Sequence, residues 1–268
     1  MAVVVFMSDG SPLSMPDPSQ LSAAARRTLA GVWTYRADAE REAERRFARL
    51  ARELRAVEAP AEAITITERA VFDEHRHAIL CKELATIYGG EAPQLRAVED
   101  VPLGPKQLDF RDRVLYEVVA FCCITETLNS SLMKVAFDAA RVPEVRAALR
   151  AILRDEIGHA RIGWAHLAAE RARGRGELIA ALVPRMLAGA IREELFSPGP
   201  ESSDAASLRD HGELPESIRL SIFEAAARDV IVPGLEELGI DTRPMREWMQ
   251  RMKSAGDRRV RDRVEEAC

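Results

Sequence analysis

The chain has 268 residues, of which 47% are hydrophobic and only 5% aromatic, and its formal net charge is -5. This length suits one core with appendages, and the abundance of Ala, Leu, Arg and Glu favours an all-α fold. The negative charge leaves no basic footprint for nucleic acid, and no apolar run approaches ~18 residues, so we expect neither nucleic acid nor a membrane as partner.

The cysteines exclude two kinds of metal site. Cys81, Cys122, Cys123 and Cys268 contain no C-x-x-C spacing, so neither a zinc ribbon nor a rubredoxin-like iron centre is expected. The first three lie in apolar helical patterns, which indicates buried free thiols. The start, MAVVVFMSDG, lacks the charged region and the apolar length of a secretory signal, so we expect a cytoplasmic protein.

The chain divides into three predicted parts: a loose arm over 1–20, a four-helix bundle over 21–172, and a C-terminal helical extension over 173–268 packed on the bundle. A helical pattern runs from Ala23 to Trp33, resumes near Ala37 and continues towards Pro60.

The second bundle helix is expected to run to Tyr88, where Gly89-Gly90 forms a C-cap signal. Its start lies between Pro60 and Thr65, because Pro60 suits a first helical position and Thr65-x-x-Glu68 has the form of a capping box. The aperiodic stretch that follows, to about Pro105, has the length of a crossover along the bundle.

The third helix is predicted over about Gln107 to Arg141, and Pro143 opens the fourth. Further helices are predicted over 177–195, 214–237 and 244–265. They carry no paired metal-ligand spacing, so we expect them to serve packing or oligomerisation.

One hexapeptide pattern occurs twice. Asp73-Glu74-His75-Arg76-His77-Ala78 and Asp155-Glu156-Ile157-Gly158-His159-Ala160 both reduce to Asp-Glu-x-x-His-Ala. Positions i and i+3 share one face of a helix, so each Glu and His can bind one ion together.

Two lone glutamates complete the pattern. In an antiparallel hairpin, side chains at one level lie equally far from the turn, and Glu126 pairs in this way with Glu156/His159 about the Val-Pro turn. Glu40 pairs similarly with Glu74/His77 and shares the apolar stripe of Phe47. Glu44 fits the turn as well but lies at the edge of the stripe, so it remains the substitute for Glu40.

With these residues placed, the chain resembles the ferritin-like superfamily of carboxylate-bridged di-iron proteins over about Arg36 to Ala169. It is closer still to a bacterial, myxobacterial-type ferritin-like domain family. Besides the twin motifs, Tyr88-Gly89-Gly90, Glu126-Thr127 and 238–242 carry this similarity. Where a typical member has Glu-His, this chain has Glu40-Arg41.

The spacing and the resemblance together imply a dinuclear metal site with six ligands: Glu40, Glu74, His77, Glu126, Glu156 and His159. Four carboxylates and two imidazoles suit iron or manganese, and two divalent ions neutralise the four negative charges. We expect two iron ions, with Mn/Fe and Mn/Mn as alternatives and O2 as co-substrate.

Four residues near the six candidate ligands each have two possible roles. Asp73 and Asp155 either accept the second ring N–H of a ligand histidine or lie on the surface. His166, two turns after His159, is either an additional ligand or a hydrogen-bonded core residue. Tyr88 either faces the site or packs as a core aromatic.

The resemblance implies a metal site rather than a reaction. Our leading hypothesis is a non-haem di-iron oxidase or oxygenase that acts on a small organic molecule, with an electron-donor protein and a homodimer as further expectations. One alternative is an iron-handling ferroxidase or peroxidase-type protein. The other is a non-catalytic helical bundle that metal stabilises.

Overall fold

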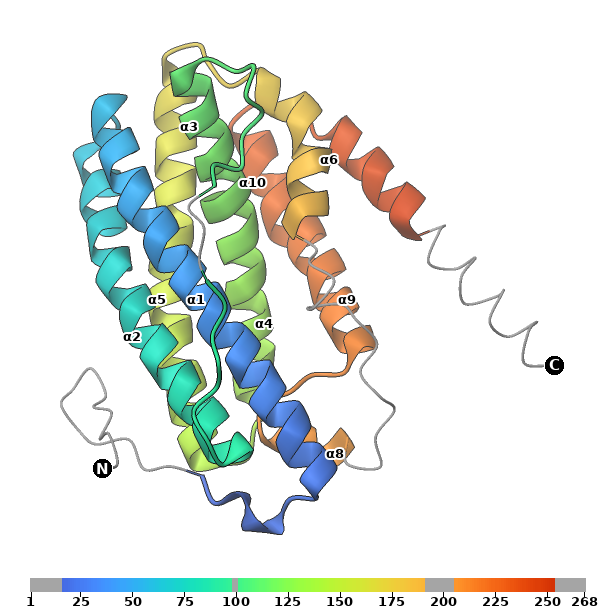
Figure 1. The fold of residues 1–268 in the computed structure, drawn as a ribbon. Helices are drawn as coiled ribbons and strands as arrows, with labels where there is room; N and C mark the ends of the chain where they lie inside the picture. The colour runs from blue at the N-terminus through green and yellow to red at the C-terminus, as the bar shows by residue number, and fades with distance from the viewer. Residues whose placement is uncertain (1–15, 98–100, 191–204, 254–268) are drawn as a thin grey trace.

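The computed structural model describes residues 16–97, 101–190 and 205–253. Within these ranges the regular structure is helical and no strand occurs, so the all-α prediction is confirmed there. Four long helical rods form a bundle, and shorter helices from the C-terminal part cover one side of it (Figure 1).

The first two rods are α1 (Ala23–Ala56) and α2 (Ala61–Gly89). The predicted break in α1 is wrong: Trp33 and Ala37 lie one turn apart on a buried face, and no Gly or Pro separates them. The capping box is also wrong, because Thr65 lies inside α2 and its hydroxyl donates to Ala61 O.

The end of α2 and the following crossover agree with expectation. Gly90 stops the helix in the left-handed conformation, with φ +83°. The chain then runs along the bundle to its other end (Figure 1). Two hydrogen bonds fasten it to α1, from Arg41 Nη1 to Arg96 O (2.8 Å) and from Arg96 N to Asp38 Oδ1 (2.9 Å). Arg41 therefore helps to hold the crossover against α1.

The third rod was predicted as one α-helix but has three parts: α3 (Phe110–Val118), a π-helical segment η2 (Val119–Thr125) and α4 (Glu126–Ala139). It starts later than expected, because the side chain of Asp109 accepts a hydrogen bond from Asp112 N and caps it. By length and composition the rod Phe110–Ala139 could cross a membrane, but 61% of its apolar window is buried in the protein.

The fourth rod, α5 (Pro143–Ala172), follows the turn that the sequence predicted at Val-Pro. Gly163 of α5 lets it approach η2 closely. A Cβ atom at this position would lie 2.6 Å from both the backbone nitrogen and the Sγ of Cys123. The packing of α5 against the third rod therefore depends on Gly163, which has no side chain and lies next to η2.

The C-terminal part adds several helices beside the third rod (Figure 1): α6 (Leu178–Ala190), α8 (Ala205–Asp210), α9 (Glu216–Ala226), the π-helical η3 (Ala227–Ile231), α10 (Val232–Glu237) and residues 243–253. The helix predicted over 214–237 is thus interrupted by η3, and α8 was not predicted. The ends expected at 195 and 265 fall outside the described residues. Buried side chains such as Ile179, Phe223 and Leu235 pack against those of the third rod.

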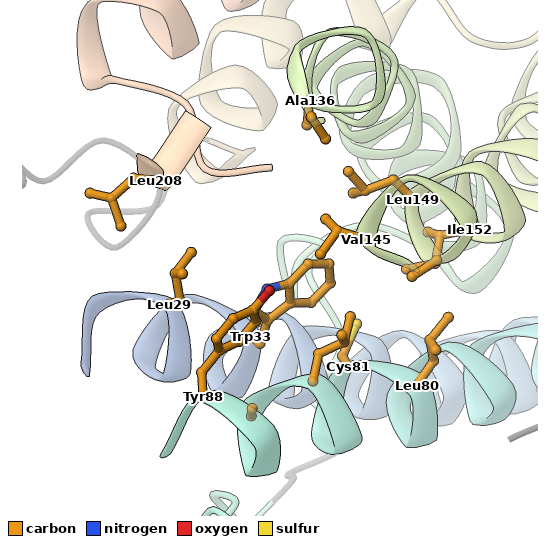
Figure 2. Packing of buried hydrophobic residues seen from close by; sticks show 14 of the residues in the cluster. Leu29, Trp33, Leu80, Cys81, Tyr88, Ala136, Val145, Leu149, Ile152 and Leu208 are labelled. Carbon is orange, nitrogen blue, oxygen red and sulfur yellow. The ribbon is translucent and has the colours of Figure 1, made fainter. Parts of the chain in front are cut away.

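A large apolar cluster fills the end of the bundle where α1 begins and α2 ends (Figure 2). Trp33 and Leu149 lie at its centre with no exposed surface. Tyr88 belongs to this cluster, and its hydroxyl lies 2.6 Å from Nδ1 of His211. Of the two interpretations of Tyr88, the packed core aromatic describes its surroundings.

A buried ion pair closes the opposite end of the bundle. Two nitrogens of Arg111 donate to the carboxylate of Glu170 at 2.8 and 2.7 Å, and Arg173 Nη1 donates at 2.8 Å. These bonds, with Arg111 first, lower the pKa of Glu170 to about 2 although burial opposes the shift. The bidentate pair ties the start of α3 to the end of α5.

We expect Glu170→Gln to destabilise the protein by about 2–3 kcal/mol at pH 7, because a lowered carboxyl pKa is a stability contribution. That contribution is complete above the unfolded pKa of about 4.3 and is lost as pH falls towards the folded value. Urea unfolding of both proteins at pH 7 and near pH 2.5 measures it. Glu177→Gln, at an exposed position nearby, is the control. A deficit that persists unchanged at low pH would contradict this account.

Candidate metal centre

The six predicted ligands come together midway along the bundle. One glutamate comes from each of α1 and α4, and a Glu/His pair comes from each of α2 and α5. All six are at most 6% exposed: Glu40, Glu74, His77, Glu126, Glu156 and His159.

Within the described part of the chain, these residues form two overlapping groups that could each hold a metal ion. One contains Glu40 and His77, and the other contains Glu126 and His159. Glu74 and Glu156 belong to both groups, and in each group the candidate ligand atoms lie within 4.8 Å of one another. Shared carboxylates between two terminal Glu/His sets are the arrangement that a pair of ions requires.

The nitrogen and oxygen atoms that face the middle of the cluster lie close together. His159 Nδ1 lies 3.0 Å from Glu74 Oε1, and His77 Nδ1 lies 3.6 Å from Glu156 Oε1. Both Nδ1 atoms and all four oxygens of Glu74 and Glu156 are nevertheless buried without a hydrogen-bond partner. Adjacent ligands of an octahedral ion with ~2.1 Å bonds lie about 3.0 Å apart, so the donor set fits metal.

Each histidine turns its other ring nitrogen towards the aspartate of the opposite motif. His77 Nε2 lies 3.2 Å from Asp155 Oδ2, where the ring N–H donates to the carboxylate. His159 Nε2 lies 3.6 Å from Asp73 Oδ2, longer than a hydrogen bond. Both aspartates are buried, so the surface alternative is wrong. The crossed arrangement leaves Nδ1 of each ring facing the glutamates.

Arg76 holds the two aspartates in place, and the sequence analysis missed it. Its Nη2 donates to Asp73 Oδ1 at 2.9 Å and to Asp155 Oδ2 at 2.6 Å, so one guanidinium joins the two motifs. The available signal was its position three residues after Asp73, which places the two side chains on the same helix face.

The six side chains shift one another's pKa values in opposite directions. Burial raises the pKa of Glu40 and Glu126 well above the usual range, and the charges of Glu74 and Glu156, respectively, add to this shift. Burial also opposes the charged forms of Glu74 and Glu156, but the close approach of the histidines outweighs it and lowers both pKa values.

The histidines complete this pattern. Burial lowers the pKa of each ring, but the surrounding carboxylates outweigh it, so the pKa of both His77 and His159 is raised. These contacts therefore favour the protonated form of both rings and the ionised form of Glu74 and Glu156, and they favour the neutral form of Glu40 and Glu126. Two divalent ions would replace the protons of all four groups.

Two further residues were candidate ligands: Glu44 as the substitute for Glu40, and His166 as an addition. Glu44 lies outside the cluster on the accessible side of α1, 3.2 Å from Nδ1 of the exposed His75. His166 is fully buried, but it is absent from both groups and neither ring nitrogen has a hydrogen-bond partner. Burial lowers the pKa of His166 to about 4, so it is a neutral core residue at neutral pH.

Aromatic side chains and a cavity border the cluster. The Phe47 ring lies 5.1 Å from that of His159 and 4.8 Å from that of Phe121. A cavity of about 560 Å³, whose lining includes Phe121, also reaches Glu40, Glu74, Glu126 and Glu156.

Most of the remaining cavity wall is apolar, and part of it comes from the C-terminal helices. Leu128, Leu132 and Met133 contribute from α4, whereas Met186 comes from α6 and Phe223 from α9. The sequence analysis expected these late helices only to pack, and no local motif marks their second role. A cavity of this volume suits a small molecule.

Comparisons with protein-family models, with curated proteins and with solved structures give no match. The interpretation of the site therefore rests on its residues and their geometry.

The opposite pKa shifts of these glutamates predict opposite effects on stability when each is replaced by glutamine. Glu40→Gln and Glu126→Gln should raise the melting temperature of chelator-treated protein at pH 7. A carboxyl with a raised folded pKa costs stability above its unfolded pKa of about 4.3, and the neutral amide removes this cost. Glu156→Gln should lower the melting temperature, because two imidazolium ions lose an ionised partner.

Thermal melts at pH 7 and pH 4 check this, since the gain for the first two variants should shrink at the lower pH. Equal destabilisation by all three variants would contradict the assigned charge states.

Proposed function

We propose that this chain is a ferritin-like protein whose six-residue cluster binds two iron ions and that it oxidises a small organic molecule with O2. When bound, the ions would supply the electrons for O2 reduction. Glu40 with His77 and Glu126 with His159 would hold one ion each, and Glu74 and Glu156 would contribute to both. Carboxylate and imidazole donors of this number favour iron or manganese.

The observation that carries the proposed reaction is the cavity of about 560 Å³ whose wall includes four of the cluster's glutamates. A protein that only stores or oxidises iron needs a path for ions, which polar walls serve best. Here the walls are mainly aliphatic and aromatic side chains, which bind an organic molecule and exclude water. We infer that a substrate lies in this cavity beside Glu40 and Glu126.

The chain's own residues would act mainly by positioning. Asp155, which Arg76 joins to Asp73, would orient the ring of His77 through a hydrogen bond. The ring of Phe47 packs against that of His159, so access is left to the cavity. The apolar wall would hold substrate against the cluster and keep bulk water away during oxidation.

The pair Glu40 and Glu44 offers a matched test of the metal site on one helix. Glu40→Ala should lose one metal ion per chain or its tight binding, because Glu40 belongs to one ligand group. Glu44→Ala should keep the wild-type content, because Glu44 contacts His75 outside the cluster. Metal analysis after anaerobic Fe(II) loading measures both, with circular dichroism as the folding control. Full occupancy in Glu40→Ala would remove Glu40 from the ligand set.

The reaction itself is tested by exposing the Fe(II)-loaded protein to O2 and following it by optical and Mössbauer spectroscopy. We expect two iron ions per chain, O2 consumption in proportion to them, and faster turnover when an accepted organic substrate is added. Continued iron uptake beyond two per chain would support the iron-handling alternative. Stable Fe(II) in the presence of O2 would support the non-catalytic bundle.

A further inference from the structure

Arg36 lies in the cavity one helical turn before Glu40, about 6 Å along the α1 axis. Its guanidinium stacks on the Trp33 ring at 4.5 Å, and its Nη2 donates to Gly212 O at 3.3 Å. Its Nη1 is buried and has no hydrogen-bond partner. A guanidinium held by stacking, with one donor unused in a cavity wall, is prepared to bind an acceptor.

The charges around Arg36 leave this end of the cavity positive. Glu213 is the nearby carboxylate, but its Oε2 lies 4.0 Å from Arg36 Nη2, and Arg219 donates a hydrogen bond to its Oε1. Arg36 and Arg219 therefore bring two positive charges to one carboxylate, whereas Arg185, which also lines the cavity, lies beside Tyr116 of α3. The other charged pair in the wall is self-contained, because Arg46 bonds to Glu42 at 3.0 Å and to Glu117.

A second polar group lies on the facing helix. Asn129 lines the same cavity, three residues after Glu126 and therefore on the same face of α4. Its amide makes no hydrogen bond within the described ranges. An amide donor opposite an unused guanidinium donor, between otherwise apolar walls, matches the oxygen atoms of one small anionic group.

We propose that the cavity binds an organic carboxylate, with its anionic group on Arg36 and Asn129 and its apolar body against Leu132, Met133 and Phe223. This inference names a substrate class for the proposed oxidase. Oxidation of the bound acid rests on the proposed function, whereas binding of the acid does not. Arg36 is a specificity-determining residue: it selects acids over their neutral analogues and holds them one helical turn from the cluster.

Binding is measured by calorimetry on the full chain, both metal-loaded and chelator-treated. The probes are 4-phenylbutanoate and decanoate, with 4-phenylbutanamide as the neutral analogue of the first. Wild type should bind an acid at least tenfold more tightly than the amide. Arg36→Gln should abolish this preference, and Arg36→Lys should restore part of it. Arg45→Gln removes the same charge from an exposed position of α1 and should change nothing.

Two results would overturn the inference. One is a wild-type protein that binds neither acid or shows no preference for the acid over the amide. The other is a folded Arg36→Gln protein that keeps the preference, which would place the anion on the metal ions or elsewhere. Metal content, measured in the same samples, keeps the two hypotheses apart. If the protein loads no metal but still binds acids through Arg36, only the oxidase proposal is refuted. If it loads metal normally but does not prefer acids, only the carboxylate site is refuted.

Discussion

The structure depends on burying four carboxyl groups and two imidazole rings in the middle of a helical bundle. Ionised groups in such a place are costly unless each charge finds a partner. Contacts within the cluster help to meet this constraint, because they raise the pKa values of Glu40, Glu126 and both histidines and lower those of Glu74 and Glu156. Two bound divalent ions would replace the protons and balance the four ionised carboxylates. Either arrangement would allow the side chains to remain buried.

The local geometry around the cluster follows from the same constraint. Asp155 orients the ring of His77, and Arg76 offsets one of the two negative charges that Asp73 and Asp155 bring with them. The close contact between Gly163 and Cys123 brings α5 against η2, the π-helical segment that directly precedes Glu126. π-Helical segments are frequent at functional sites, and here the segment helps to place one of the six donors.

The sequence predicted the parts of the site that depend on helical periodicity. Each Glu-x-x-His pair lies within one helix, so its geometry is local, and the hairpin arithmetic then placed Glu126 and Glu40 at the correct levels. The sequence did not reveal the π-helical segment. The residues of η2 are almost all apolar, as those of a buried α-helix would be, so their pattern does not distinguish the two kinds of helix. Arg76 and Asp73 are neighbours on α2, but only the packing of α2 against α5 brings Asp155 to Arg76. The contribution of α6 and α9 to the cavity likewise depends on tertiary packing.

The cavity beside the cluster takes its wall from more than the four rods. The rings of Phe47 and Phe121 pack together, and Phe121 also lines the cavity. Met186 of α6 and Phe223 of α9, from the C-terminal extension, complete the wall. A four-helix bundle alone would leave that wall open to solvent. We infer that the extension converts a buried group of ligands into a site with room for an organic molecule, and Arg36 provides the cavity with a fixed positive charge.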